Sequence, residues 1–248
     1  MKTQSSWPAR IVGVLFIIGT VAGALSGVFV GPTFGAPNFP ANVAGDANQL
    51  VIGALLVLLM GVALAMVPVV LFPVLRQHDE TLAFGYVIFR GALEPLGYIG
   101  TALGWFLLIA LSRAAGSLDD QTLQFWGAVI NDAENWIGQI EGVVFGLGSL
   151  MLNVVFYRSR LIPRWLSGWG VVGALLYVAG NVAGMFDPLH PTLSLEAGLG
   201  MLMAPTALQE MVKALWLIVK GFNQPAPSRT QAAGHMGLPA HSGGTATS

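Results

Sequence analysis

The sequence predicts an all-α polytopic membrane protein, a bundle of six transmembrane helices with both termini cytoplasmic. Three observations indicate this fold class. The 248 residues are 54% hydrophobic and 9% charged, with a mean hydropathy of +0.70, whereas soluble domains carry roughly 25% charged residues. Apolar runs of the length that crosses a bilayer recur along the chain, and the basic residues gather in alternate connections between these runs.

Composition also excludes several kinds of function. The net charge is -1 and the basic residues are scattered, so nucleic acid is not an expected partner. The chain has no cysteine, which excludes disulfides, thiolate nucleophiles and cysteine-ligated metals. No pair of histidines lies at i, i+4 on an expected span, which disfavours a haem or zincin site. We therefore expect no cofactor and no metal, and a lipid bilayer as the main partner; the sequence carries no signal for an oligomeric state.

Six segments meet the length requirement of a membrane span. A hydrocarbon core about 30 Å thick is crossed by about 20 apolar residues in a helix, and backbone groups inside it need partners within the same segment. The expected spans are approximately 11–30, 49–75, 81–112, 136–157, 165–186 and 198–222.

The two ends of the chain are expected to lie outside the bilayer. Residues 1–10 are predicted to be a cytoplasmic N-terminus, because the run that follows is longer than the apolar region of a signal peptide and is interpreted as an uncleaved span. Residues 223–248 are rich in Gly, Pro, Ser and Thr. This composition predicts a disordered cytoplasmic tail.

Orientation follows from the excess of Lys and Arg in cytoplasmic connections. With the N-terminus inside, the outer side holds only Arg113. The inner side holds Lys2, Arg10, Arg76, Arg158, Arg160, Arg164, Lys220 and Arg229.

The outer connection from 113 to 135 contains an amphipathic pattern. Leu123, Trp126, Val129 and Ile130 recur at helical spacing, opposite acidic residues. This pattern is typical of a helix that lies flat on a membrane surface. We therefore expect a separate interfacial helix here.

Small residues predict which helix faces pack closely. Helices in lipid associate where side chains are short enough for backbones to approach. Spacing by four residues indicates contact faces in three spans, at Gly19, Gly23 and Gly27, at Gly100 and Gly104, and at Gly180 and Gly184.

Ionisable residues inside the spans mark the most informative positions, since such residues usually face the bundle interior or a cavity. At 1.5 Å per residue, Arg90 and Glu210 each lie about 15 Å from the inner ends of their helices. We expect these two to pair across helices, because Arg four residues before Glu94 is the weaker order for a pair within one helix. Lys213 is closer to the inner surface, and we expect its side chain to extend toward water.

A second group of polar residues lies farther from the inner ends of the helices, by the same rise of 1.5 Å per residue. Glu94, Tyr98, Glu141 and Asn181 fall at similar depths. They predict the outer half of a cavity, with aromatic walls from Trp105 and Phe106.

Two further features bear on this cavity. Pro95 removes a backbone donor and predicts a kink beside Glu94. Two cations, Arg90 and Lys213, face three carboxyls in the spans, so the bundle is either net negative or has one carboxyl protonated. Asn153 is expected to form a hydrogen bond between helices.

Three stretches together resemble a bacterial membrane-protein family catalogued as domain of unknown function 4386. They are RQHDETLAFGYVIFRGALE, FYRSRLIPRWLSGWGVVGALL and LQEMVKALWLIVKGF. The resemblance extends from Arg10 to Phe222. It implies a compact polytopic bundle in the cytoplasmic (inner) cell membrane, with Arg90, Glu94 and Glu210 as the polar positions that matter. It implies no activity.

Three kinds of function stay open. The first is binding or transport of an amphipathic or lipid-like small molecule in a polar intramembrane pocket. The second is an intramembrane enzyme that acts on a lipid or isoprenoid with a carboxyl as general acid. The third is a structural or regulatory partner of another membrane protein, in which buried ion pairs serve only to fix helix packing.

Overall fold

The computed structural model describes residues 7–35, 39–186 and 204–223. Helices make up 89% of these residues, and none of them lies in a strand, which confirms the all-α prediction. The elements in chain order are α1 (Trp7–Phe34), η1 (Ala41–Ala44), α2 (Ala47–Leu75), α3 (Glu80–Tyr86), η2 (Val87–Leu93), α4 (Glu94–Arg113), η3 (Ala115–Ser117), α5 (Asp120–Ser159), α6 (Arg164–Met185) and α7 (Ala204–Val219).

Five of the expected spans are confirmed as helices long and apolar enough to cross a membrane. They are α1, α2, the continuous stretch Glu80–Arg113, α5 and α6. The sixth expected span, 198–222, contains α7, which has 16 residues and a length of about 24 Å. Residues 198–203 and the expected tail beyond Asn223 lie outside the described residues. The sixth span and the orientation of the termini therefore stay predictions.

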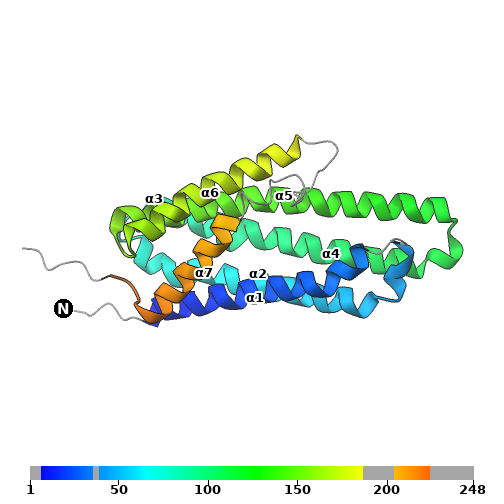
Figure 1. Cartoon of the computed structure of the whole chain (residues 1–248), viewed down its shortest axis with the longest axis horizontal. Coiled ribbons are helices and arrows are strands. Elements are labelled where there is room, and N and C mark those ends of the chain that lie inside the picture. Colours follow the sequence, from blue (N-terminus) through cyan, green and yellow to red (C-terminus); the bar gives the residue numbers. More distant parts are fainter. Residues whose placement is uncertain (1–6, 36–38, 187–203, 224–248) are drawn as a thin grey trace, which may run out of the picture.

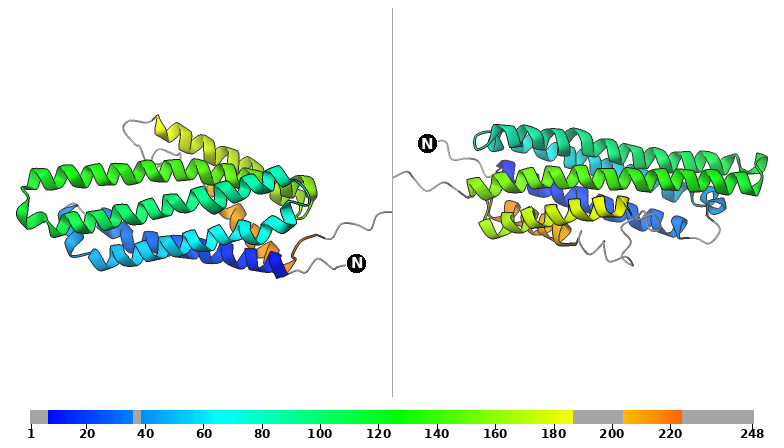
Figure 2. Two further views of the ribbon diagram at one scale, coloured as in Figure 1. Left: turned by 180° about the vertical axis from the view of Figure 1, so that it is seen from behind. Right: turned by 90° about the horizontal axis from the view of Figure 1, so that it is seen from above.

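The long helices run side by side along the longest axis (Figure 1). Helix α1 packs on α2, α2 on α4, α4 on α5 and α5 on α6. Helix α7, drawn in orange, crosses the others obliquely and packs against α1 and α6. The other two views in Figure 2 show the same arrangement.

Polar contacts tie the connections together at the end where α1 begins and α7 ends (Figure 1). An ion pair joins Arg158 Nη1 to Asp79 Oδ2 at 3.4 Å. The backbone N–H of Asn223, just after α7, donates to the carbonyl of Leu161 at 2.7 Å in the α5–α6 turn. The same turn contains Arg160, which adopts a left-handed conformation with φ of 58°.

The expected interfacial helix is wrong as a separate element. Residues 120–159 form one continuous helix, α5, so the amphipathic segment continues directly into the span. Asp119 starts this helix by accepting the backbone N–H of Thr122 at 2.9 Å, and this hydrogen bond holds the pKa of the Asp119 carboxyl below its usual range. No proline interrupts the segment afterwards. Part of the apolar face packs on the protein, since Leu123 is buried and Gly127 lies against Pro40, whereas Trp126 and Val129 are exposed.

The region around Pro95 contains a π-helical segment. Residues 87–93 form η2, between α3 and α4, and the N–H of Glu94 donates to the carbonyl of Phe89, five residues earlier. Pro95 then sits in the first turn of α4, directly after the π-helical segment. The helix therefore changes its pitch next to Glu94, before the proline, and the kink expected at Pro95 stays a prediction. Such π segments are frequent at functional sites.

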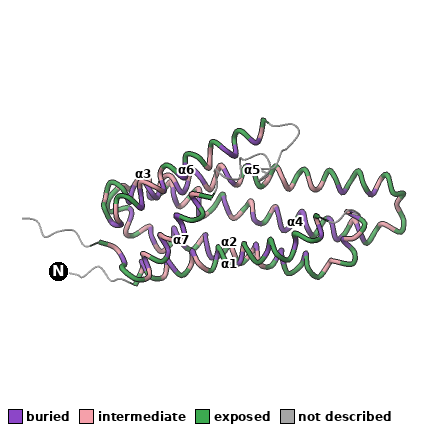
Figure 3. Tube along the Cα trace, viewed as in Figure 1, coloured by how far each residue is buried: buried purple, intermediate pink, exposed green. Residues whose placement is uncertain are grey.

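Large apolar side chains cover the outside of the bundle. Figure 3 shows exposed residues along the outward sides of the helices and buried ones between them. The exposed set includes Val28, Leu55, Val62, Leu96 and Leu107. Soluble proteins rarely expose so much contiguous apolar surface. These outward sides are suited to contact with lipid tails.

Glycines permit close helix contacts at some of the predicted positions. A Cβ atom built on Gly19 would lie 2.6 Å from Leu64 Cδ2, and one on Gly100 would lie 3.2 Å from Ile137. A Cβ on Gly27 would meet nothing within 4 Å, so the contact predicted at Gly27 is wrong. The tightest contact to backbone on α1 is at Gly13, where a Cβ would lie 2.6 Å from the carbonyl oxygen of Ala214 in α7.

We expect Gly13→Ala to destabilise the protein, because the added methyl group meets a backbone oxygen that cannot turn away. Overpacking of this kind costs about 1–3 kcal/mol. Gly27→Ala is the matched control on the same helix, and its better helix propensity should leave stability unchanged or raise it. The measurement is thermal unfolding in detergent. Equal midpoints for the two variants would contradict the close α1–α7 contact.

Candidate functional site

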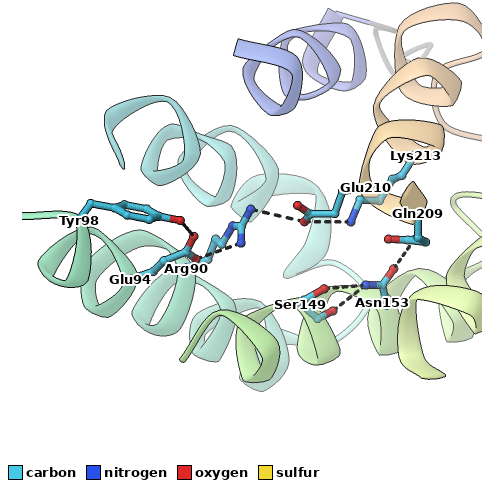
Figure 4. Close-up of polar contacts among 8 residues, drawn as sticks. All are labelled: Arg90, Glu94, Tyr98, Ser149, Asn153, Gln209, Glu210 and Lys213. Carbon is cyan, nitrogen blue, oxygen red and sulfur yellow. Dashed lines mark hydrogen bonds and ion pairs between the residues drawn. The ribbon is translucent and has the colours of Figure 1, made fainter. Parts of the chain in front are cut away.

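Arg90 lies at the centre of the polar interior (Figure 4). Its side chain is buried. Nη1 is 3.1 Å from Glu94 Oε2, and Nη2 donates to Glu210 Oε1 at 3.4 Å. The guanidinium carbon lies 4.5 Å from the ring centroid of Phe145 and 5.8 Å from that of Phe16. Aromatic faces attract cations, so two carboxylates and two rings together stabilise the buried charge.

Glu94 differs from its prediction. The Arg90–Glu210 pair is present as expected, but Glu94 also pairs with Arg90, and it accepts a hydrogen bond from the Tyr98 hydroxyl at 2.6 Å. Glu94 is buried and is therefore not a free group lining the outer cavity. The order of the two residues, with Arg90 four residues before Glu94, had disfavoured an ion pair within one helix. The π-helical turns of η2, which lie between the two residues, were not predicted from the sequence.

Lys213 also differs from its prediction. It is 0% exposed and does not extend toward the inner surface. Its Nζ lies 3.6 Å from Glu210 Oε1 and 4.8 Å from the ring centroid of Phe16. The reason is the placement of α7, which turns this residue toward α1. Glu210 therefore lies between two cations, Arg90 and Lys213.

Helix α7 buries a polar stripe. Thr206, Gln209, Glu210 and Lys213 recur at the spacing of one helix face, and all four are buried. Gln209 Nε2 donates to Asn153 Oδ1 at 3.1 Å and to the carbonyl of Leu166 at 3.0 Å, which joins α7 to α5 and α6. The expected role of Asn153 between helices is thereby confirmed. Sequence reasoning missed Gln209, although the spacing of the stripe signals it.

Asn153 is itself held from its own helix. Its Nδ2 donates to the Ser149 carbonyl at 2.8 Å and to the Ser149 hydroxyl at 3.2 Å (Figure 4). A Cβ built on Gly170 would collide with the Asn153 amide. Gly170 therefore allows α6 to approach α5 closely enough for the network to form.

A cavity of about 320 Å³ lies beside the ion-pair cluster. Arg90, Glu141 and Glu210 form its charged lining, and the Tyr98 side chain also lines it. Its remaining lining is small or apolar: Thr20, Gly23 and Ala24 of α1, Met60 and Leu64 of α2, Phe145 of α5, Tyr177 of α6 and Ala207 of α7. The cavity lining therefore combines three charged side chains with a larger number of small or apolar ones.

The residues of this cluster lie in a segment of the chain that matches a known protein family. The family model described as a domain of unknown function, DUF4386, matches residues 11–221. The chain belongs to this family. No curated protein and no solved structure matches the chain. The match to DUF4386 includes every residue of the ion-pair cluster and of the cavity lining.

Two residues that the sequence predicted as walls of the cavity lie elsewhere. Trp105 is buried against Phe34, with ring centroids 6.5 Å apart, and Phe106 is partly exposed. Neither lines the cavity. The aromatic walls are Phe145 and Tyr177, whose ring centroids are 4.7 Å apart. Depth along a helix placed Trp105 near the site, but the direction of its side chain carries it to the α1–α2 side.

Asn181 is close to the site without lining it. Its Nδ2 donates to the Tyr177 carbonyl at 2.8 Å, one turn earlier in α6. A Cβ built on Gly142 would collide with the Asn181 amide, so Asn181 fills the space next to the backbone of Glu141. Asn181 therefore supports the α5–α6 contact behind the cavity wall.

The charges of the cluster do not balance. The interior contains Arg90 and Lys213 against Glu94, Glu141 and Glu210. The ion pairs of the two cations go to Glu94 and Glu210. Within the described ranges Glu141 makes no ion pair, and no group of three potential metal ligands comes together. Glu141 is thus the one of these three carboxyls that has no ion pair among the described residues.

We expect Arg90→Gln to destabilise the protein by about 3–5 kcal/mol, because Glu94 and Glu210 would lose the cation that their burial requires. The control is Arg158→Gln, which removes the exposed pair with Asp79 and should cost no more than about 1 kcal/mol. Thermal or denaturant unfolding of the purified protein measures both changes.

A double variant tests the cause of that loss. Adding Glu94→Gln to Arg90→Gln removes one of the two carboxylates that the first change leaves unpaired. We expect it to recover part of the lost stability. If the double variant is less stable than Arg90→Gln alone, the charge argument is wrong and packing of the guanidinium between the rings is the main contribution.

Proposed function

We propose that this chain is a membrane protein that binds or transports an amphipathic or lipid-like small molecule in the cavity lined by Arg90, Glu141 and Glu210. The observation that carries the proposal is the mixed lining of this cavity. Arg90, Glu141 and Glu210 contribute charged groups, and small or apolar side chains make up most of the rest. Binding pockets typically combine apolar walls with a few placed polar groups.

The residues have distinct roles in this proposal. Glu141 faces the bound polar group, and Tyr98 and Arg90 border it. Glu94 and Glu210 hold Arg90 in place. We assign to Asn181 a supporting role: it packs against Gly142, next to Glu141, and does not contact the ligand. Thr20, Gly23 and Ala24 leave room for an apolar body beside α1.

We further propose that the protein lies in the cytoplasmic membrane with both termini inside. The support is the distribution of charge. Arg76, Arg158, Arg160 and Arg164 belong to the connections at the end where α1 begins, whereas Arg113 belongs to the opposite end (Figure 1). An excess of basic residues marks the cytoplasmic side.

The binding proposal predicts a ligand effect on stability that requires Glu141. Purified protein is heated with single members of a panel of lysophospholipids, fatty acids and alkylamines. At about 100 times its dissociation constant a ligand adds about 2.7 kcal/mol to stability. We expect at least one class to raise the unfolding midpoint of the wild type and to leave Glu141→Gln unchanged.

Glu134→Gln is the matched control for this test, since Glu134 lies on the same helix and does not line the cavity. It should keep the full ligand response. If every class leaves the wild type unchanged, or if Glu141→Gln responds as the wild type does, the proposed binding site is wrong.

The orientation can be tested by labelling single cysteines, because the chain has none of its own. Ser117→Cys lies at the α4–α5 end and Gln77→Cys at the α2–α3 end, and both positions are exposed. We expect a membrane-impermeant maleimide to label Ser117→Cys in intact cells and Gln77→Cys only after lysis. The reverse pattern would contradict the proposed orientation.

A further inference from the structure

A groove of about 290 Å³ runs along the outer surface between α4 and α5. Leu96 is 62% exposed and Ile140 is 57% exposed at its rim. The rest of the lining is Leu93, Gly97, Ile137, Val144 and Glu141. Glu141 is the one ionisable residue of this lining. A carboxyl at the floor of an apolar groove is unusual on a surface suited to lipid, where charged side chains are costly.

Glu141 belongs to both hollows. It lines the groove between α4 and α5, and it also lines the cavity beside Arg90. Gly97 explains how one side chain reaches both. A Cβ built on Gly97 would lie 2.6 Å from Glu141 Cγ and 3.1 Å from Glu141 Oε2. Glu141 therefore occupies the space that a side chain at 97 would fill, and it separates the groove from the cavity.

The charge of Glu141 is available to a ligand. The ion pairs of Arg90 go to Glu94 and Glu210, and that of Lys213 goes to Glu210. A carboxylate facing apolar surroundings is stable only when a cation or a proton neutralises it. The group that complements it from the bilayer side is a cation carried by an apolar body.

We propose that the groove between α4 and α5 is a lateral entrance from the bilayer to the cavity, and that Glu141 recognises a lipophilic organic cation there. The inference rests on the proposed function and names its ligand class. Leu93, Leu96 and Ile140 contact the apolar body, and the Glu141 carboxylate pairs with the positive charge. The small α1 residues of the cavity receive the ligand after it passes Gly97.

The entrance is tested with dicyclohexylcarbodiimide, an apolar reagent that partitions into membranes. The protonated carboxyl adds across one C=N bond of the reagent. The proton goes to nitrogen, the carboxyl oxygen bonds to the central carbon, and the acyl group then migrates to nitrogen to give a stable N-acylurea. No atom leaves and nothing is oxidised. Peptide mass spectrometry of protein labelled in membranes locates the adduct.

We expect the reagent to label Glu141 several-fold faster than Glu94, which is ion-paired, and Glu134, which lines neither hollow. Leu93→Trp should slow labelling of Glu141 several-fold by filling the groove from its rim. Leu103→Trp on the same helix is the control, because Leu103 is exposed outside the groove, and should leave the rate unchanged. Absence of labelling, or equal rates in the two variants, would overturn the entrance.

The ligand class is tested in the same assay with two ions of one shape. Tetraphenylphosphonium should slow labelling of Glu141 several-fold, and tetraphenylborate should not. Equal effects of the two ions, or no effect of either, would overturn the assignment to a cation. Labelling without ligand reports only on the groove. If Glu141 is labelled through the groove but no ligand raises the unfolding midpoint, the entrance is supported and the proposed function is wrong.

Discussion

The buried charge of Arg90 is the constraint on which the rest of the structure depends. A guanidinium deep in an apolar bundle is stable only if other groups satisfy it. Glu94 from α4 and Glu210 from α7 supply the negative charge, and Phe16 and Phe145 supply the flanking faces. These partners come from four helices. One charge therefore fixes the relative position of α1, α4, α5 and α7 more narrowly than apolar contacts could, since lipid competes equally for apolar surfaces.

Helix α7 shows how the bundle accommodates this charge. It is the helix whose polar face points inward, and its apolar residues Leu208, Leu215 and Val219 point outward. The inward face gives Gln209 to the Asn153 network and Glu210 to the two cations. The helix is held by hydrogen bonds and ion pairs at successive turns. Ala207, near the start of α7, lines the cavity together with the short side chains of Thr20 and Ala24 in α1.

The sequence was sufficient to predict those features that depend only on position along the chain or along a helix axis. Apolar length located five helices, and distance along the helix axis put Arg90 and Glu210 at one level, where they form an ion pair. The sequence-based prediction failed where the rotation of a helix about its axis determines which way a side chain points. Depth alone could not show that Lys213 faces inward or that Trp105 turns away from the cavity.

Two further errors have local causes. The amphipathic segment after Asp119 has the composition of a surface helix, but nothing in it ends a helix, and so it joins the span. The π-helical segment η2 depends on the fit of Arg90 against α5, where a Cβ on Gly148 would lie 3.4 Å from the Arg90 nitrogen. The first feature follows from the lack of a helix-ending residue in the segment, whereas the second involves a neighbouring helix and is not visible in residue preferences.

The continuity of α5 has a consequence for the shape of the protein in a cell. Its 40 residues give a rod about 60 Å long, roughly twice the thickness of the hydrocarbon layer. Even at a tilt of about 40°, such a rod covers about 46 Å along the bilayer normal. Part of it must therefore lie outside the hydrocarbon layer. Asp119 and Asp120 at the α4–α5 connection are exposed, and such charged side chains suit the part of the rod that lies outside this layer.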